Sequence, residues 1–179
     1  MEHYKTVSEL HRNNGWEPPE DPLFGMVHYR QNHGLGEGEF SCDCYMIGFT
    51  KQAQGAMLCG GKSYDHTNGS MMFGKPRQVV AMKNIELEKN GFILFIHEDY
   101  LQGNELCKTI NKYDFFESGI NEALCLSPAE EEIIYSLHRK IEREYYNTTD
   151  EYSRGIIISH IKALLTYTDR FFKQHLKLQ

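Results

Sequence analysis

Long apolar runs are missing from this sequence of 179 residues. A helix that spans a bilayer needs about 20 consecutive apolar residues. No segment approaches that length, so we expect no membrane-spanning helix and no membrane partner. The N-terminal stretch MEHYKTVSELHRNN is polar and contains no hydrophobic core of a secretory signal. Together with an odd number of cysteines, 5 in all, these absences favour a cytoplasmic protein with reduced thiols.

Positive charge is also scarce, because 19 Lys and Arg residues face 25 Asp and Glu residues, for a net charge of −6. Such a surface repels phosphate backbones, so the chain by itself is not expected to bind DNA or RNA. The sequence lacks a G-x-S-x-G nucleophile motif and a G-x-x-x-x-G-K-[ST] phosphate loop. Cys42 and Cys44 lie two residues apart, but no second cysteine pair has ligand spacing. We therefore expect buried, inert thiols.

The glycines divide the chain into two parts, since all but one of the 15 lie between Gly15 and Gly119. This distribution predicts a turn-rich region followed by a helical tail. A capping box at Thr6 and Glu9 predicts a short first helix, and three prolines within 18–22 predict an extended arm. Runs of strand length then follow with turn signals between them, as in an all-β sandwich or barrel. These runs are 24–30, 40–49, 54–59, 70–75, 78–82 and 91–97.

The tail has the signals of two helices. Ser127 and Glu130 form a second capping box with Pro128 at the first helical position, which predicts a helix that starts there. Its apolar residues follow the 3.6-residue period of an amphipathic helix. The segment 147–150 ends this helix and caps a second one, which runs to about Lys177. We expect two antiparallel helices packed on a β domain.

Several segments together carry a resemblance to a known family. Tyr64-Asp65, followed by 69–73 and the turn 74–78, has the pattern of a central hairpin. The segment 91–101 has the pattern of a last long strand and the helix after it, and 115–145 that of a link into a pair of helices. These patterns resemble the cupin sensor domain of AraC-family transcription regulators, and the resemblance extends over the whole chain.

The resemblance implies a mainly β fold with C-terminal α: a cupin-like double-stranded β-helix (jelly-roll barrel) followed by two antiparallel helices. Residues 1–22 would form a short helix and arm, 23–126 an effector-binding barrel, and 127–179 a helical segment that forms a homodimer. A DNA-binding unit of two helix-turn-helix motifs would follow in such regulators. The chain is then the sensor half of a regulator, and it contacts DNA only through a domain absent from these residues.

Many cupins are metalloenzymes, and their motifs can be compared with this sequence. Gly60 and His66 fit the first motif of the enzymes. Asn68 stands where a second histidine belongs, and Met71 and Met72 stand where a glutamate belongs. The histidine of the second motif is also absent. A metal site needs three or four converging donors, so we expect no catalytic metal, no cofactor and no enzymatic activity.

An unknown small-molecule effector is implied inside the barrel, where alternate residues of each strand face inward. Within 40–49 one alternating set contains Tyr45 and Ile47, and the other contains Cys44 and Met46. We expect the first set to face inward, because it begins with polar residues near the mouth and becomes apolar deeper. The expected effector-binding residues are His28, Tyr45, Ile47, Tyr64, Met72 and Phe95. For each of them a plain packed core is the alternative.

The last helix carries more apolar residues than one neighbouring helix can bury, which favours an interface with a second copy of the chain. The expected dimer-interface residues are Ile157, Ile161, Leu164, Leu165 and Phe172. The alternative is that the helix buries all of them against its own barrel. For the whole chain, the alternatives to a sensor domain are a stand-alone cupin enzyme and a purely structural dimerisation module with a filled barrel.

Overall fold

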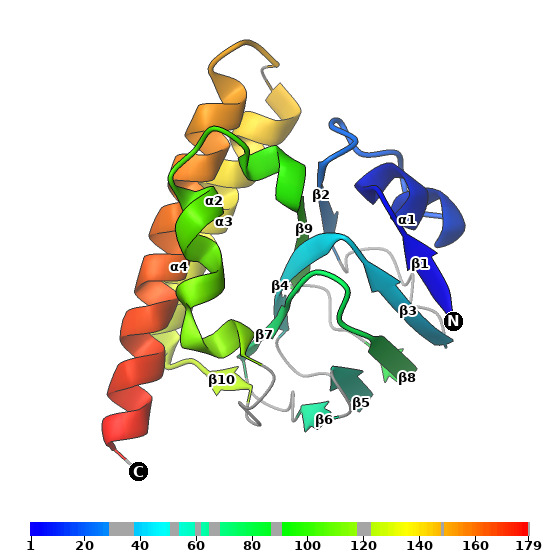
Figure 1. The fold of residues 1–179 in the computed structure, drawn as a ribbon. Helices are drawn as coiled ribbons and strands as arrows, with labels where there is room; N and C mark the ends of the chain where they lie inside the picture. Colours follow the sequence, from blue (N-terminus) through cyan, green and yellow to red (C-terminus); the bar gives the residue numbers. More distant parts are fainter. Residues whose placement is uncertain are drawn as a thin grey trace.

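The structure, a computed structural model, describes residues 1–28, 38–50, 54–59, 62–64, 69–86, 91–117, 123–147 and 149–178. Within 54–59, 62–64 and 82–86 it describes the backbone only. The described residues form three layers (Figure 1). Two β-sheets pack on one another, and a layer of helices covers the outer face of one of them.

The strands divide between two five-stranded sheets. Sheet A contains, in spatial order, β1 (Glu2–Tyr4), β3 (Gly38–Cys42), β8 (Val80–Glu86), β5 (Gln54–Cys59) and β6 (Lys62–Tyr64). Sheet B contains β10 (Leu124–Cys125), β7 (Ser70–Gly74), β4 (Cys44–Thr50), β9 (Phe92–His97) and β2 (Phe24–His28). The β1–β3 pair is parallel and the other described pairs are antiparallel. A strand is present in each of the six runs expected from the sequence.

Local capping signals fix where the helices begin. Helix α1 (Val7–Asn13) starts at Thr6, whose Oγ1 accepts a hydrogen bond from the Glu9 backbone N–H at 3.2 Å. Helix α3 (Pro128–Asn147) starts after Ser127, whose Oγ accepts from the Glu130 N–H at 3.3 Å while the Glu130 carboxylate accepts from the Ser127 N–H at 2.8 Å. The box at Ser127 and Glu130 is therefore confirmed in full. The one at Thr6 is confirmed in part, because the Glu9 carboxylate accepts its hydrogen bond from the Lys5 N–H, at 2.7 Å. The short helix α2 (Leu106–Thr109) and the second long helix, α4 (Ser153–Lys177), complete the helical layer.

The run 40–49, expected as one strand, is two strands in different sheets. β3 ends at Cys42 in sheet A and β4 begins at Cys44 in sheet B, so the chain passes between the sheets at Asp43. Arg77 holds this crossing: its backbone N–H donates to the Cys42 carbonyl at 2.7 Å. The Arg77 guanidinium also forms ion pairs with Asp43 at 3.3 Å and with Glu98 at 2.7 Å. Arg77 adopts a left-handed φ of 66° to make these contacts.

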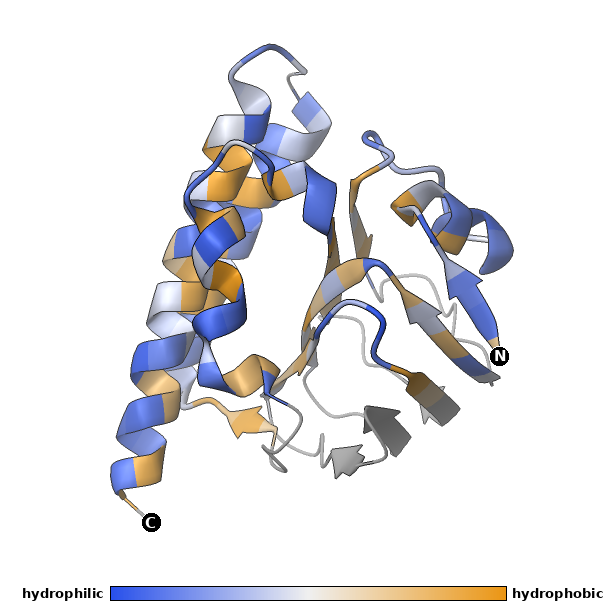
Figure 2. Ribbon diagram, in the orientation of Figure 1, coloured by the Kyte–Doolittle hydropathy of each residue, from blue (hydrophilic) through white to orange (hydrophobic). Residues whose placement is uncertain are grey.

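Two apolar clusters lie on the two faces of sheet B. The larger cluster fills the space between sheet B and the helices; it contains Phe49, Leu94 and the inward faces of α3 and α4. The smaller cluster lies between the two sheets and beneath α1; it contains Val7, Met46 and other buried residues. Figure 2 shows the apolar colour along β2, β4 and β9 and its alternation with polar colour along α3 and α4, which is the pattern of helices with one buried face.

The mainly β fold with C-terminal helices is therefore confirmed. The closed jelly-roll barrel is not: among the described residues each sheet has its own strand order, with β2 and β10 at the edges of sheet B. None of the helices that the structure describes is both long and apolar enough to cross a membrane.

Candidate functional site

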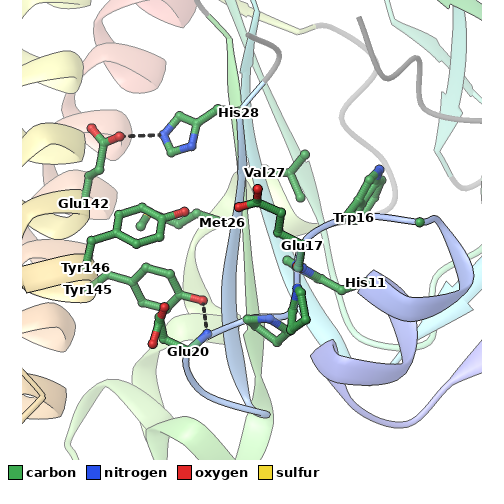
Figure 3. A pocket seen from close by; sticks show the side chains of 13 residues that line it. His11, Trp16, Glu17, Glu20, Met26, Val27, His28, Glu142, Tyr145 and Tyr146 are labelled. Atoms are coloured by element: carbon green, nitrogen blue, oxygen red, sulfur yellow. Dashed lines mark hydrogen bonds and ion pairs between the residues drawn. The ribbon is translucent and has the colours of Figure 1, made fainter. Parts of the chain in front are cut away.

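A cleft of about 390 Å³ separates the N-terminal segment from helix α3, with strand β2 as its floor (Figure 3). The N-terminal segment contributes His11 and residues 15–20, β2 contributes 26–28, and α3 contributes Glu142, Tyr145 and Tyr146. The cleft thus joins two parts of the chain that lie more than a hundred residues apart in the sequence. Its volume falls in the range of small-molecule sites.

His11 and Trp16 form the N-terminal side of the cleft. The His11 ring is buried, and its Nδ1 is 2.6 Å from the Glu17 carbonyl, to which it donates. Burial lowers the pKa of His11, and the hydrogen bond to Glu17 offsets part of this shift. Trp16 packs on Phe95 with the ring centroids 5.9 Å apart and presents an edge-to-face contact to His11 at 5.5 Å. These contacts fix the indole at the cleft wall.

Gly25 lets helix α1 approach strand β2 closely enough to build this side. A Cβ at position 25 would lie 2.6 Å from Val7 Cγ1 and 2.8 Å from His11 Nε2. A side chain there would displace these two buried side chains and, with them, the helix α1 that carries them, since real Cβ contacts are essentially never that short. The spacing of the cleft's N-terminal wall from its floor therefore depends on this glycine.

Tyr145 ties the opposite wall to the arm. Its hydroxyl accepts a hydrogen bond from the Glu20 backbone N–H at 2.7 Å and donates to the Phe24 carbonyl at 3.5 Å. Burial raises the pKa of Tyr145 above its ordinary value, so the hydroxyl stays protonated even in alkaline solution and can both donate and accept. Helix α3 and the arm are thus connected directly at one end of the cleft, as Figure 3 shows.

Three side chains with metal-ligand chemistry converge at the other end of the cleft. His28 Nε2 lies 3.2 Å from His138 Nε2 and 3.3 Å from the nearest Glu142 carboxylate oxygen. His138 is buried, with its ring stacked on Phe92 at 3.8 Å between centroids. His28 and Glu142 are partly exposed and line the cleft. The three ligand atoms all lie within 4.8 Å of one another.

The structure does not bring the six expected effector-binding residues together. Tyr45 and Ile47 face the helices instead of the space between the sheets, so their expected orientation is wrong. The alternation itself continues through the crossing at Asp43, because Phe40 and Cys42 of β3 lie between the sheets together with Cys44 and Met46 of β4. The error was to take the set that begins with polar residues as the inward one.

Of the other four, Met72 and Phe95 lie in the cluster between the sheets, and His28 lies on the helix side at the cleft. The side chain of Tyr64 lies outside the described residues, as do Gly60, His66 and Asn68 of the cupin motif. A binding role for these residues stays a prediction.

The five residues expected at a dimer interface are buried within the chain itself. Ile157, Ile161, Leu164, Leu165 and Phe172 all belong to the cluster between α4, α3 and sheet B. The largest exposed fraction among them is 8%, at Phe172, so they have no surface to offer a partner. The expectation that this stripe forms the interface is wrong, because the helix layer and the sheet together bury a wider stripe than one helix would.

Sequence reasoning named His28 but missed both of its neighbours. A signal for them was present: His138 and Glu142 are four residues apart, and a helix places such a pair on one face. The meeting with His28, 110 residues earlier in the chain, needed the fold. The hydrogen bond of Tyr145 to the arm has no sequence signal, because its partner lies 125 residues earlier in the chain.

Comparison with known proteins gives few matches. No protein-family profile matches the chain, and no curated protein matches it. Among solved structures, the chain is similar to the crystal structure of the AraC-like transcriptional activator CuxR, with a TM-score of 0.42 and 12% sequence identity. The alignment covers 72% of this chain and 41% of that one, so the chain spans less than half the length of that activator. No residue role is carried over from this match.

Proposed function

We propose that this chain is the small-molecule sensor domain of an AraC-like transcription regulator, and that its effector binds in the cleft between the N-terminal segment and α3. The observation that carries the proposal is the cleft itself, a cavity of about 390 Å³ in which aromatic and polar side chains from three elements converge. The sequence resemblance described above supports the regulatory context. The effector site is then at the edge of sheet B and outside the space between the sheets.

The lining of the cleft favours a small amine with a flat apolar part. Glu17, Glu20 and Glu142 bring three carboxylates, and no Lys or Arg is among the thirteen described lining residues. Trp16 and Tyr146 supply aromatic faces, which attract a cationic group by a cation–π interaction. A phosphate or carboxylate effector would meet repulsion from the same carboxylates.

The position of the cleft suggests how binding is relayed. An effector that contacts both walls would change the link between the Glu20 N–H and the Tyr145 hydroxyl, which sets the arm against α3. α3 packs along α4 in the helical layer. In regulators of this family the helices lead to the DNA-binding unit, so a shift of α3 is a direct route for the signal.

A homodimer remains part of the proposal, with a different face of α4 as its interface. The outward side of α4 has a shallow groove formed by Ser159, Lys162, Ala163, Thr166, Tyr167 and Arg170. Small residues at 159 and 163 allow a second helix to approach, and Ile156 at 39% exposure adds apolar surface one turn earlier. A second copy of the chain would meet this face with the same residues, in an isologous contact.

Tryptophan fluorescence offers a direct test, because Trp16 is the only tryptophan in the chain and lines the cleft. The probes are phenethylamine and its matched acid, 3-phenylpropanoate, titrated in the presence of EDTA and followed by a wider panel of amines. We expect saturable changes in Trp16 emission with amines and weaker changes with the acids.

Two exposed tyrosines provide a matched pair of variants. Tyr146→Ala, at the cleft, should weaken amine binding several-fold, whereas Tyr152→Ala, outside it at the start of α4, should not. If no amine perturbs Trp16, or if both variants bind equally, the cleft is not the effector site, and a structural dimerisation module becomes the better description.

A further inference from the structure

We propose that His28, His138 and Glu142 form a binding site for a divalent transition-metal ion, with Zn²⁺ as the preferred ion. The site goes beyond the proposed effector function and does not depend on it. It also uses none of the cupin-motif positions, so the missing motif ligands have no bearing on it.

Two of the three distances between the ligand atoms match the edges of a tetrahedral site, and the third, between His138 and Glu142, is no more than 4.8 Å. Zn²⁺ binds histidine nitrogen at about 2.0–2.1 Å and carboxylate oxygen at about 2.0–2.2 Å, so two ligands of a regular tetrahedron lie about 3.3–3.5 Å apart. His28 Nε2 lies 3.2 Å from His138 Nε2 and 3.3 Å from Glu142 Oε1. These two edges match a zinc tetrahedron, and the His138–Glu142 edge reaches the same length by a side-chain movement of at most about 1.5 Å.

The donor set is one that zinc uses in proteins. Two imidazoles and one carboxylate supply three ligands and leave the fourth position for water or another donor. Borderline-soft imidazole nitrogens favour zinc and its neighbours in the first transition row over magnesium or calcium, which prefer oxygen ligands alone. One carboxylate beside two neutral imidazoles also offsets part of the ion's charge.

The ligands are held in place before any ion binds. The ring of His138 is stacked on Phe92 at 3.8 Å and meets the ring of His28 edge-on at 5.0 Å. Glu142 follows His138 by one helical turn of α3, so both project from the same face toward β2. A site with preset ligands loses little side-chain entropy when it binds an ion.

An ion at this position would fasten strand β2 to helix α3. His28 is the last residue of β2, and the other two ligands lie in the middle of α3. The link would complement the Tyr145 hydrogen bond at the opposite end of the cleft. Since His28 and Glu142 both line the cleft, the fourth coordination position is open to a molecule bound there.

The test is calorimetric titration of the untagged, EDTA-treated chain with Zn²⁺, repeated with Co²⁺ to read the coordination geometry from its visible spectrum. We expect one equivalent of Zn²⁺ to bind and Co²⁺ to give the intense absorption of a tetrahedral site. At a free Zn²⁺ concentration of 100 times Kd, the melting temperature should rise by about 5–10 °C. Absence of saturable binding at one equivalent would overturn the proposal.

Three variants separate the site from adventitious binding by the other histidines. Glu142→Gln keeps the shape of the side chain and should lower Zn²⁺ affinity at least tenfold, and His28→Gln should do the same. His175→Gln is the matched control, because His175 pairs with Glu130 at 3.1 Å on a different part of the surface. Unchanged affinity in the first two variants, or loss in the control, would overturn the proposal. The amine titration is run in EDTA and the Zn²⁺ titration without any amine. Each hypothesis can therefore fail while the other is still tested.

Discussion

Replacement of Gly25 by alanine should lower the stability of the domain, although it adds only one methyl group. The new Cβ would lie 2.6 Å from Val7 Cγ1 and 2.8 Å from His11 Nε2, and both side chains are almost fully buried. Relief of these contacts requires α1 to move away from β2, and overpacking of this kind costs about 1–3 kcal/mol. For a chain of this size the melting temperature should fall by roughly 2–12 °C.

The same substitution at Gly155 should instead stabilise the domain. Gly155 lies in the first turn of α4, is exposed, and has nothing within 4 Å of an added Cβ. Alanine there removes backbone freedom from the unfolded chain and should stabilise the domain by up to about 1 kcal/mol. The comparison therefore controls for the general effect of a glycine-to-alanine change.

Thermal unfolding followed by circular dichroism measures both variants, and Trp16 emission adds a local readout. Because Trp16 follows α1 and contacts His11, displacement of the helix in Gly25→Ala should alter its emission in the folded state. If Gly25→Ala melts at or above the wild-type temperature with unchanged emission, α1 does not pack on β2 as described, and the account of the cleft wall fails.

Two further predictions concern titration and the helical layer. Burial lowers the pKa of His11 in the folded protein below its ordinary value of about 6.5. Below about pH 6.5 the unfolded chain therefore binds a proton at His11 more readily than the folded chain does. The free energy of unfolding should consequently fall as the pH is lowered. In urea unfolding, His11→Asn should reduce the dependence of the unfolding free energy on pH by up to about 1.4 kcal/mol per pH unit. The same pH dependence in the variant and the wild type would contradict this prediction. Leu164→Ala should cost about 2–5 kcal/mol, because the side chain has 0% exposure, without changing the oligomeric state of the folded protein. In light scattering, the neighbouring Ala163→Glu should split the proposed dimer; because Ala163 packs partly on the larger cluster, circular dichroism must show that the variant is folded. A dimer that survives this change would contradict an interface on the outward face of α4.

Features that depend on a few consecutive residues were predictable from the sequence. Thr6 and Ser127 cap their helices as expected, because a side chain and a backbone N–H three residues apart need no distant partner. Each of the six strand-length runs contains a strand, since turn residues separate the runs, although the run 40–49 is divided between two sheets. The layered arrangement with C-terminal helices followed from the change in composition along the chain.

Features that depend on how the sheets meet were not predictable. The orientation of Tyr45 was wrong because the set that begins with polar residues was taken as the inward one, whereas the alternate set, from Phe40 to Met46, lies between the sheets on both sides of the crossing at Asp43. Nothing in the local pattern marks that crossing, which Arg77 holds from another part of the chain. The buried stripe on α4 likewise indicates that the helix is covered, but an amphipathic pattern carries no information on whether the cover is the same chain or a second copy.

The hydrogen bond between Glu20 and Tyr145 also sets the order in which the domain can be completed during synthesis. Its partners are separated by 125 residues, and a ribosome that adds 5–20 residues per second needs roughly 6–25 s to make the intervening chain. Until then the arm has no opposite wall to contact, and contacts of such high sequence separation are slow to form. The cleft therefore exists only in the finished domain, so a nascent chain could not bind the proposed effector before helix α3 has left the ribosome.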